Sequence, residues 1–267
     1  MAATTYRVIA YNTAKDSDNK IHDDAVARRY GFGSGLVPGV DVYAYMTHPP
    51  VSTWGLAWLT HGTAGCRFQT PVYDGNEAVV TAAQDPDDSN RLTLSVDSAG
   101  ESCATGWAAL DADRIPPPSI HEIERAPLPD QRPPASTESL AAGRTLGTYE
   151  SVYAAATAPT YLAEVREVLP VYAEEGIAHP GYILRLGNRA LTENVVLGPW
   201  IHVGSTVQHF GLAHLGDRLF TRARVLDNYE RKGHRFVELD VIVAVDDVRV
   251  IARIHHTAIY EPRPRTD

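Results

Sequence analysis

Cysteine and clustered positive charge are both scarce in this sequence. Only Cys66 and Cys103 occur among 267 residues, too few for a disulfide framework or a four-thiolate metal site. We expect both thiols to be reduced, buried small side chains rather than nucleophiles. Lysine and arginine never follow one another for more than two residues, and the formal net charge is −9. Because phosphate contacts require clustered basic side chains, a general nucleic-acid binder is excluded.

Long apolar runs are also missing. No apolar stretch reaches the roughly 18 residues that a membrane-spanning helix needs, so no membrane association is expected. The N-terminal stretch MAATTYRVIAYNTA lacks the basic and apolar regions of a signal peptide. With reduced thiols, this predicts a cytoplasmic protein. A hydrophobic content of 44% and a charged content of 21% are typical of a globular chain long enough for two domains.

Proline is concentrated in one place. Seven of the 18 prolines lie between Asp111 and Gly147. Proline fixes φ and removes a backbone donor, so this stretch is unsuited to the interior of a helix or sheet. We therefore predict a linker over 113–147 that joins an N-terminal unit, 1–112, to a C-terminal unit, 148–267.

The two units resemble each other at a constant spacing. Four features recur 142 residues apart, namely Pro38-Gly39 and Pro180-Gly181, Trp58 and Trp200, Gly62 and Gly204, and Phe68 and Phe210. A shared offset over residues of these types favours a duplicated structural unit.

Each Pro-Gly pair precedes a segment of helical character, since proline is well tolerated at a helix start. These segments are 40–50 in the first unit and 182–195 in the second. Strand-like runs follow at 65–73, 77–84, 90–97, 217–229, 234–246 and 248–260. The last three alternate apolar and polar residues, as antiparallel strands with one covered face do. The pattern predicts an α+β fold in which two sheets each wrap around a helix and join side by side.

The stretch from Ser17 to Val40 combines acids, one histidine and a glycine-rich run. The order is Asn19, Ile21, His22, Asp24, Ala27, Gly31-Phe32 and Gly39. Taken alone, the polar beginning is also suited to capping a surface helix, with Asp18 or Asn19 as the N-cap.

In residue types and spacing this stretch resembles the hydratase motif of the MaoC-like, (R)-specific enoyl-CoA hydratase and dehydratase family. The duplicated units likewise resemble a double hotdog fold. The sequence departs from the family motif at several positions. Ser17 stands where the family has an aspartate, with Asp16 and Asp18 on either side, Lys20 replaces a proline, and Pro38 replaces a frequent histidine. The distance from His22 to Gly31-Phe32 is also one residue shorter than usual.

The resemblance implies an (R)-specific hydratase or dehydratase acting on an acyl-CoA or acyl-carrier-protein thioester. Asp16 and His22 would activate water and protonate C2, with Asn19 orienting them. The backbone N–H of Gly39 would stabilise charge on the thioester oxygen, although this glycine also suits close helix packing. The expected substrate-binding residues are Phe32, Val37, Pro38 and Tyr43, of which Tyr43 is equally suited to core packing.

One active site per chain is expected, in the first unit. Glu164 stands at the repeat position of His22, so the second unit is expected to lack catalytic residues. No metal or other cofactor is expected, because the spacing of the histidines fits no strong zinc pattern. Alternation along the last strand predicts that His255 and His256 face opposite sides of the sheet.

Two other functions stay open at this stage. A hotdog thioesterase would use a carboxylate and the same helix-start donor to direct water at the carbonyl carbon. A non-catalytic acyl-binding subunit would need no intact motif. A homodimer is also possible, since sheet edges and helix faces often pair in this architecture.

Overall fold

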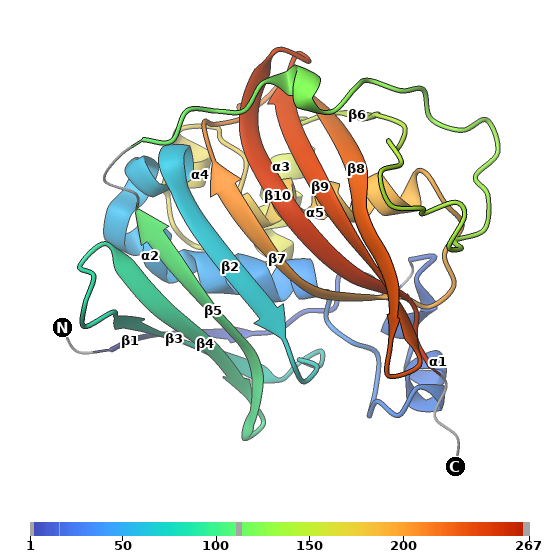
Figure 1. The fold of residues 1–267 in the computed structure, drawn as a ribbon. Coiled ribbons are helices and arrows are strands. Elements are labelled where there is room, and N and C mark those ends of the chain that lie inside the picture. The colour runs from blue at the N-terminus through green and yellow to red at the C-terminus, as the bar shows by residue number, and fades with distance from the viewer. Residues whose placement is uncertain (1–2, 16, 111–113, 264–267) are drawn as a thin grey trace.

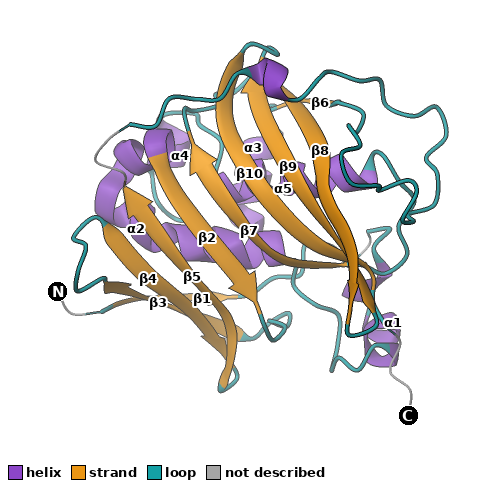
Figure 2. Ribbon diagram, viewed as in Figure 1, coloured by secondary structure: helices purple, strands orange, loops and turns teal. Residues whose placement is uncertain are grey.

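A computed structural model describes residues 3–15, 17–110 and 114–263 of the chain. Its strands form one antiparallel sheet of ten strands, and the two long helices lie against one face of that sheet (Figure 1, Figure 2). In the first unit the elements are β1 Thr4–Ile9, α1 Asp24–Arg29, α2 Gly39–His61, β2 Gly62–Phe68, β3 Glu77–Gln84, β4 Arg91–Ser98 and β5 Glu101–Leu110. In the second unit they are β6 Tyr149–Val152, α3 Thr157–Glu164, α4 Val171–Glu174, α5 Pro180–Thr192, β7 Ile201–His209, β8 Arg218–Arg231, β9 His234–Val245 and β10 Arg249–Glu261.

The sheet shows the duplication directly. The strand order is β1-β3-β4-β5-β2-β7-β10-β9-β8-β6, so each unit contributes five strands in the same order outward from the centre. The units meet where β2 pairs with β7, with Thr63 opposite Gln208 and Arg67 opposite Gly204. The α+β double arrangement expected from the sequence is therefore confirmed. The exact boundaries of the two units stay a prediction, because strands of both share one sheet.

The central helices begin where the sequence predicts, at the two Pro-Gly pairs, but α2 is longer than expected. It runs through Pro49 and Pro50 to His61, with a kink at Gly55, where φ is 55° and ψ is −138°. A proline removes an intrahelical donor. The two carbonyls that lose a helical partner are therefore those of Tyr45 and Met46, one turn earlier.

The tryptophan pair of the repeat is not structurally equivalent. Trp58 lies in the last part of α2, whereas Trp200 lies in the loop before β7. Both are buried, but α2 leads directly into β2, while a loop over 193–200 separates α5 from β7. Because α5 has 13 residues against the 23 of α2, the loop after α5 makes up most of the difference in length between the two units.

Three strands, namely β1, β6 and β7, were not expected as such from the sequence. Strand β5 is rich in alanine and glycine, which have low strand propensity, and it forms because β2 and β4 pair with it on both edges. Strand formation there is decided by tertiary pairing rather than by local pattern.

The proline-rich linker packs on the second unit. Within residues 114–147 of the linker, the 3₁₀ turn η2 (Ile120–Glu122) is the one helical element, and none of the strands β1–β10 lies there. Ile120 and Ile123 pack against Ile242, Ala244 and Val250 of the sheet.

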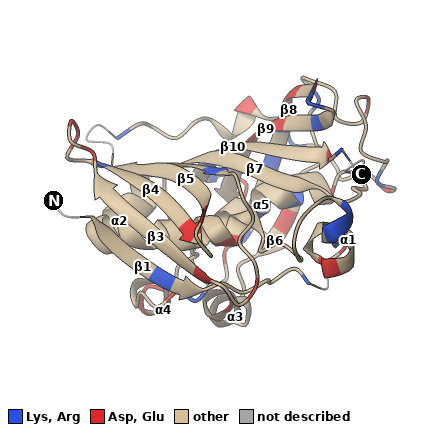
Figure 3. Cartoon of the chain, turned by 90° about the horizontal axis from the view of Figure 1, so that it is seen from below, with Lys and Arg blue, Asp and Glu red and all other residues tan. Residues whose placement is uncertain are grey.

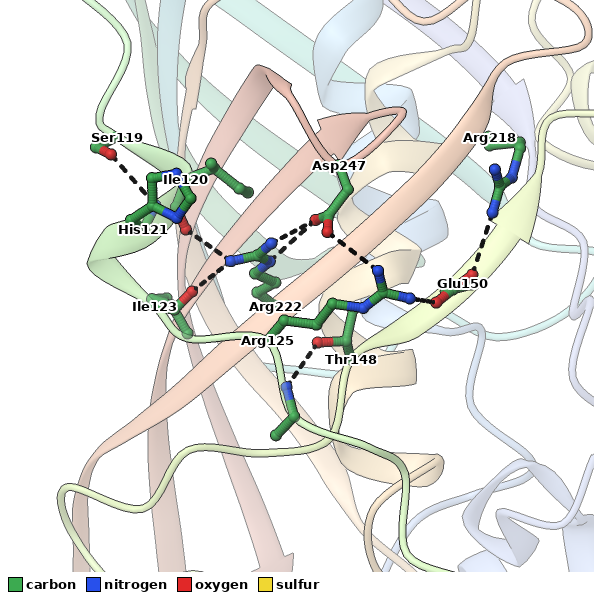
Figure 4. Close-up of polar contacts among 11 residues, drawn as sticks. Ser119, Ile120, His121, Ile123, Arg125, Thr148, Glu150, Arg218, Arg222 and Asp247 are labelled. Carbon is green, nitrogen blue, oxygen red and sulfur yellow. Dashed lines mark hydrogen bonds and ion pairs between the residues drawn. The ribbon is translucent and has the colours of Figure 1, made fainter.

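One buried arginine holds this turn in place. The Arg222 guanidinium donates to the carbonyls of Ile120 at 3.1 Å and Ile123 at 3.0 Å, and it pairs with Asp247 at 2.7 Å (Figure 4). Arg125 of the linker also reaches Asp247, at 3.4 Å. The linker is thus fixed to the outer face of the sheet by apolar contacts and by charge.

Charges of both signs are interspersed over the face seen in Figure 3. Helix α1 shows the pattern on a small scale, with Asp24 in its first turn and Arg28 and Arg29 in its last. This placement complements the helix dipole. Among the described residues, no helix is both long and apolar enough to cross a membrane.

Candidate active site

His22 lies at the end of a 3₁₀ turn, η1 (Lys20–His22), which Asn19 caps. Its ring Nδ1 is 2.7 Å from the carbonyl oxygen of Leu36. A carbonyl only accepts, so Nδ1 carries the proton and Nε2 is left with a lone pair. Burial lowers the pKa of His22, although the Leu36 carbonyl and the charge of Asp41 oppose this. The ring is therefore a neutral imidazole, which is the form a general base needs.

Asn19 ties this turn to the second unit. Its amide Nδ2 donates to the Trp200 carbonyl at 3.0 Å, and its Oδ1 accepts from the Trp200 N–H at 3.2 Å. The same Nδ2 is 3.3 Å from Nε2 of His22. Asn19 thus contacts His22 and also connects the motif to the segment that leads into β7, while its orienting role stays a prediction. The helix-capping alternative is met in part, since Asn19 is the N-cap of the 3₁₀ turn, whereas the N-cap of α1 is Asp23.

Glycine and Asp24 shape the loop behind His22. A Cβ on Gly35 would lie 2.0 Å from the His22 carbonyl oxygen, so only glycine fits there. Asp24 accepts from the Gly35 N–H at 2.8 Å. The acid that follows His22 in the motif therefore holds the returning chain, which in turn presents the Leu36 carbonyl to the ring.

The returning chain leads into α2 at Gly39. Pro38 is the N-cap and supplies no side-chain hydrogen bond. Backbone donors in the first turn of a helix have no intrahelical acceptor, and the helix dipole is positive there. A Cβ on Gly39 would lie 2.9 Å from Cε2 of Phe68 and 3.1 Å from Nδ1 of His202. Glycine thus allows the Phe68 and His202 rings to pack close to the helix start.

These groups border a mostly apolar cavity of about 290 Å³. His22, Asn19 and Gly39 line it, together with three of the four expected substrate-binding residues, Phe32, Val37 and Pro38.

Of the other two expected residues, Tyr43 is not among those that line the cavity. It is 1% exposed and belongs to the central core, in agreement with the core-packing alternative. Asp16 lies outside the described residues.

A second, more polar cavity of about 820 Å³ adjoins the first. His22, Asn19 and Pro38 line both cavities, so the histidine stands at their junction. The second cavity is also lined by three arginines, Arg132, Arg185 and Arg189. Arg185 is held by the buried Asp41, whose carboxylate it meets at 2.7 Å.

The second unit contributes side chains that the sequence did not predict. Asn188 of α5 lines both cavities, and His202 of β7 lines the apolar one. No short-range spacing connects either residue with His22. Only the pairing of β2 with β7 and the packing of α2 against α5 bring them to the site.

Thiol and metal chemistry find little support at the site. Cys66 and Cys103 are buried, as expected, and burial raises the pKa of the Cys66 thiol to about 12. Burial also raises the pKa of Cys103, which lines the apolar cavity. Within residues 3–15, 17–110 and 114–263, no group of three or more His, Cys, Asp or Glu side chains is placed to hold a metal ion.

No protein-family model matches the sequence, and no curated protein matches it. Solved structures do match. One is described as a MaoC domain protein dehydratase from Chloroflexus aurantiacus, with a TM-score of 0.64 and 12% identity over 98% of this chain and 95% of that one. Another is a conserved hypothetical protein of Mycobacterium tuberculosis with a double hotdog fold, with a TM-score of 0.64 and 13% identity over 97% of this chain and 96% of that one.

The chain therefore has the double hotdog fold seen in MaoC-like dehydratase structures, as the sequence resemblance implied. A hotdog structure described as an oleoyl thioesterase from Lactobacillus plantarum also matches, with a TM-score of 0.50 and 12% identity over 98% of both chains. Because dehydratases and thioesterases share this architecture, the fold alone does not select the reaction.

Proposed function

We propose that the chain is an enoyl-thioester hydratase or, in the reverse direction, a 3-hydroxyacyl-thioester dehydratase. One observation carries the proposal. The neutral His22 has its tautomer fixed by the Leu36 carbonyl, and it borders the same apolar cavity as the open helix start at Gly39. A base and an oxyanion donor on one apolar cavity suit addition of water next to a thioester.

In this mechanism Nε2 of His22 accepts a proton from water while the water oxygen forms a bond to C3. Charge moves through C2 to the thioester oxygen, where the Gly39 N–H stabilises it. A proton then reaches C2, and Asp16 is the proposed donor. The reverse sequence removes the C2 proton and expels the hydroxyl group as water, so the same residues serve both directions.

The two cavities suggest how an acyl thioester would lie. The apolar cavity suits the acyl chain, and the larger cavity with its arginines suits the phosphate-bearing arm of CoA or of an acyl carrier protein. The thioester would then sit at their junction, beside His22. A homodimer stays a prediction.

The test is the loss of enoyl absorbance when purified protein is mixed with crotonyl-CoA and with longer enoyl-CoAs. We expect hydration by the wild type and its loss in both His22→Ala and Asp16→Asn. Activity retained in Asp16→Asn alone would move the proton donor to Asp18 or Asp24. Release of free CoA thiol without hydration would replace the proposal by a thioesterase, and binding without turnover would replace it by a non-catalytic acyl-binding subunit.

A further inference from the structure

His202 belongs to the second unit but lies at the helix start of the first. Its side chain projects from β7 and lines the apolar cavity together with Gly39 and His22. The Nδ1 atom is 3.1 Å from the place that a Cβ on Gly39 would occupy. The narrow space beside the Gly39 Cα is therefore bounded by the Phe68 ring and by an imidazole nitrogen of His202.

This nitrogen has no partner within the described part of the chain. His202 is 7% exposed, and its Nδ1 is buried without a hydrogen bond. A buried polar atom without a partner is unfavourable, so such an atom on a residue that lines a cavity indicates a ligand contact. Burial, together with the adjacent His256, lowers the pKa of His202 well below its usual value.

Hydrogen bonds through Ser205 to His256 determine which nitrogen of the His202 ring carries the proton. Nε2 of His202 is 2.8 Å from the Ser205 hydroxyl, which is 3.0 Å from Nδ1 of His256. The two rings stack with centroids 4.3 Å apart. Burial, followed by the charge of His255, lowers the pKa of His256 to about 3, so both stacked rings are neutral near pH 7.

Two arrangements of the Ser205 hydroxyl proton give Nδ1 of His202 opposite roles. If Ser205 donates to His202, then Nδ1 of His202 carries a proton and faces the cavity as a donor. If Ser205 donates to His256, then Nδ1 of His202 is an acceptor. A ligand oxygen without a proton selects the first arrangement.

We propose that Nδ1 of His202 donates a hydrogen bond to the thioester carbonyl oxygen, beside the Gly39 N–H, with Ser205 as the positioning residue that sets the tautomer. This inference rests on the proposed function, since it assigns the contact made by the acyl thioester. It gives the second unit a direct part in the site.

The contact requires one movement. The Phe68 ring packs edge-on against His202 with centroids 4.9 Å apart, and it lies close to Gly39. Phe68 ends β2 and is only partly buried, so its ring has room to turn. Entry of the thioester carbonyl would displace this ring from the space beside Gly39.

The experiment uses two non-reacting probes on ¹⁵N-histidine-labelled protein. Butyryl-CoA has the thioester carbonyl, and S-butyl-CoA lacks it. We expect butyryl-CoA to fix His202 as the Nδ1–H tautomer in ¹⁵N NMR spectra, and S-butyl-CoA to leave the tautomer mixture of the wild type unchanged. In Ser205→Ala the same probe should no longer fix the tautomer.

Turnover gives a second readout. His202→Phe keeps a ring without donors and should lower kcat about 100-fold, the usual order for one lost oxyanion donor. His209→Phe is the matched control, because His209 is also buried on β7 but is not among the residues that line the cavity, and its kcat should stay near that of the wild type.

Two results would overturn the inference in different ways. Butyryl-CoA binding with no response at His202 would remove the contact and leave the proposed function intact. Failure of butyryl-CoA to bind at all would overturn the proposed function, and the inference with it.

Discussion

The two units begin their central helices with the same Pro-Gly pair, but only one of these helix starts is open. At α2, Pro38 offers no cap, and Gly39 borders the apolar cavity. At α5, the residue before the proline is His179, and its Nδ1 accepts from the Gly181 N–H at 3.0 Å. The donors of the second helix start are thus already used inside the protein.

Packing closes the second helix start further. A Cβ on Gly181 would lie 2.3 Å from the Tyr161 hydroxyl oxygen and 2.7 Å from Cβ of Ala44. His179 is itself fully buried, and its Nε2 faces Glu167 at 3.4 Å. The two helix starts therefore occupy equivalent places in the duplicated fold, but in the second one an internal side chain acts as the N-cap. One active site per chain stays a prediction.

The largest expected effect separates the histidines that accompany the two helix starts. His22→Ala should lower the hydration rate by about 10²- to 10⁴-fold, because it removes the general base. His179→Ala should leave the rate per folded molecule near that of the wild type. Steady-state kinetics on crotonyl-CoA with both variants provide the measurement. Equal losses in the two variants would contradict the assignment of the site to the first unit.

The two glycines offer a paired test of stability against activity. Gly181→Ala forces a methyl group against buried neighbours and should lower the free energy of unfolding by about 1–3 kcal/mol, with activity retained. Gly39→Ala meets its nearest neighbours, Phe68 and His202, at the longer distances of 2.9 and 3.1 Å, so a smaller loss of stability is expected and its main effect is on turnover. We expect about a 100-fold loss of kcat, since the methyl group fills the space for the oxyanion.

Urea unfolding and kcat should be measured on both glycine variants. A stability loss confined to Gly181→Ala and a turnover loss confined to Gly39→Ala would support the contrast. Retained turnover in Gly39→Ala would show that no substrate oxygen approaches this helix start.

Acid should lower both the stability contributed by His179 and the activity that depends on His22, because burial lowers the pKa of each histidine. Burial lowers the pKa of His179, although Glu167 opposes this, so the unfolded chain binds the proton first. The stability contributed by neutral His179 is complete above about pH 6.5 and is lost as pH falls towards the lowered folded-state pKa, by at most about 1.4 kcal/mol per pH unit.

The pKa of His22 is shifted in the same direction, since burial lowers it too. The kcat/KM profile should be flat above about pH 6.5 and fall only below it. In His179→Asn the acid slope of stability should be smaller, while the kcat/KM profile stays as in the wild type. Denaturation and kinetics between pH 5 and 8 provide both curves, and a kcat/KM profile that falls on going from acid to neutral pH would exclude His22 as the base.

The smallest effect concerns the cap itself. His179→Ala at pH 7 should cost about 1 kcal/mol, the usual loss for a removed N-cap. His179→Asn, whose side-chain oxygen is able to accept from the Gly181 N–H, should lose less. Thermal unfolding of the two variants makes the comparison. Equal destabilisation would mean that packing around His179, rather than capping, closes the second helix start.

Local pattern predicted the parts of the fold that depend on neighbours in sequence. The alternating runs became β8, β9 and β10, and His255 and His256 do face opposite sides, the first exposed and the second fully buried. Local pattern failed at β7, whose strand character comes from pairing on both edges. It also ended α2 too early, because that helix continues through Pro49 and Pro50 to His61.

The sequence by itself determined the duplication, the two helix starts and the segment that holds His22, because each of these depends on residues close together along the chain. The tertiary structure decided which helix start is open and which side chains of the second unit reach it. Asn19 meets Trp200 across 181 residues, and His202 approaches Gly39 only through the register of β2 on β7. Such contacts follow from how two sheets join, and spacing along one chain does not encode them.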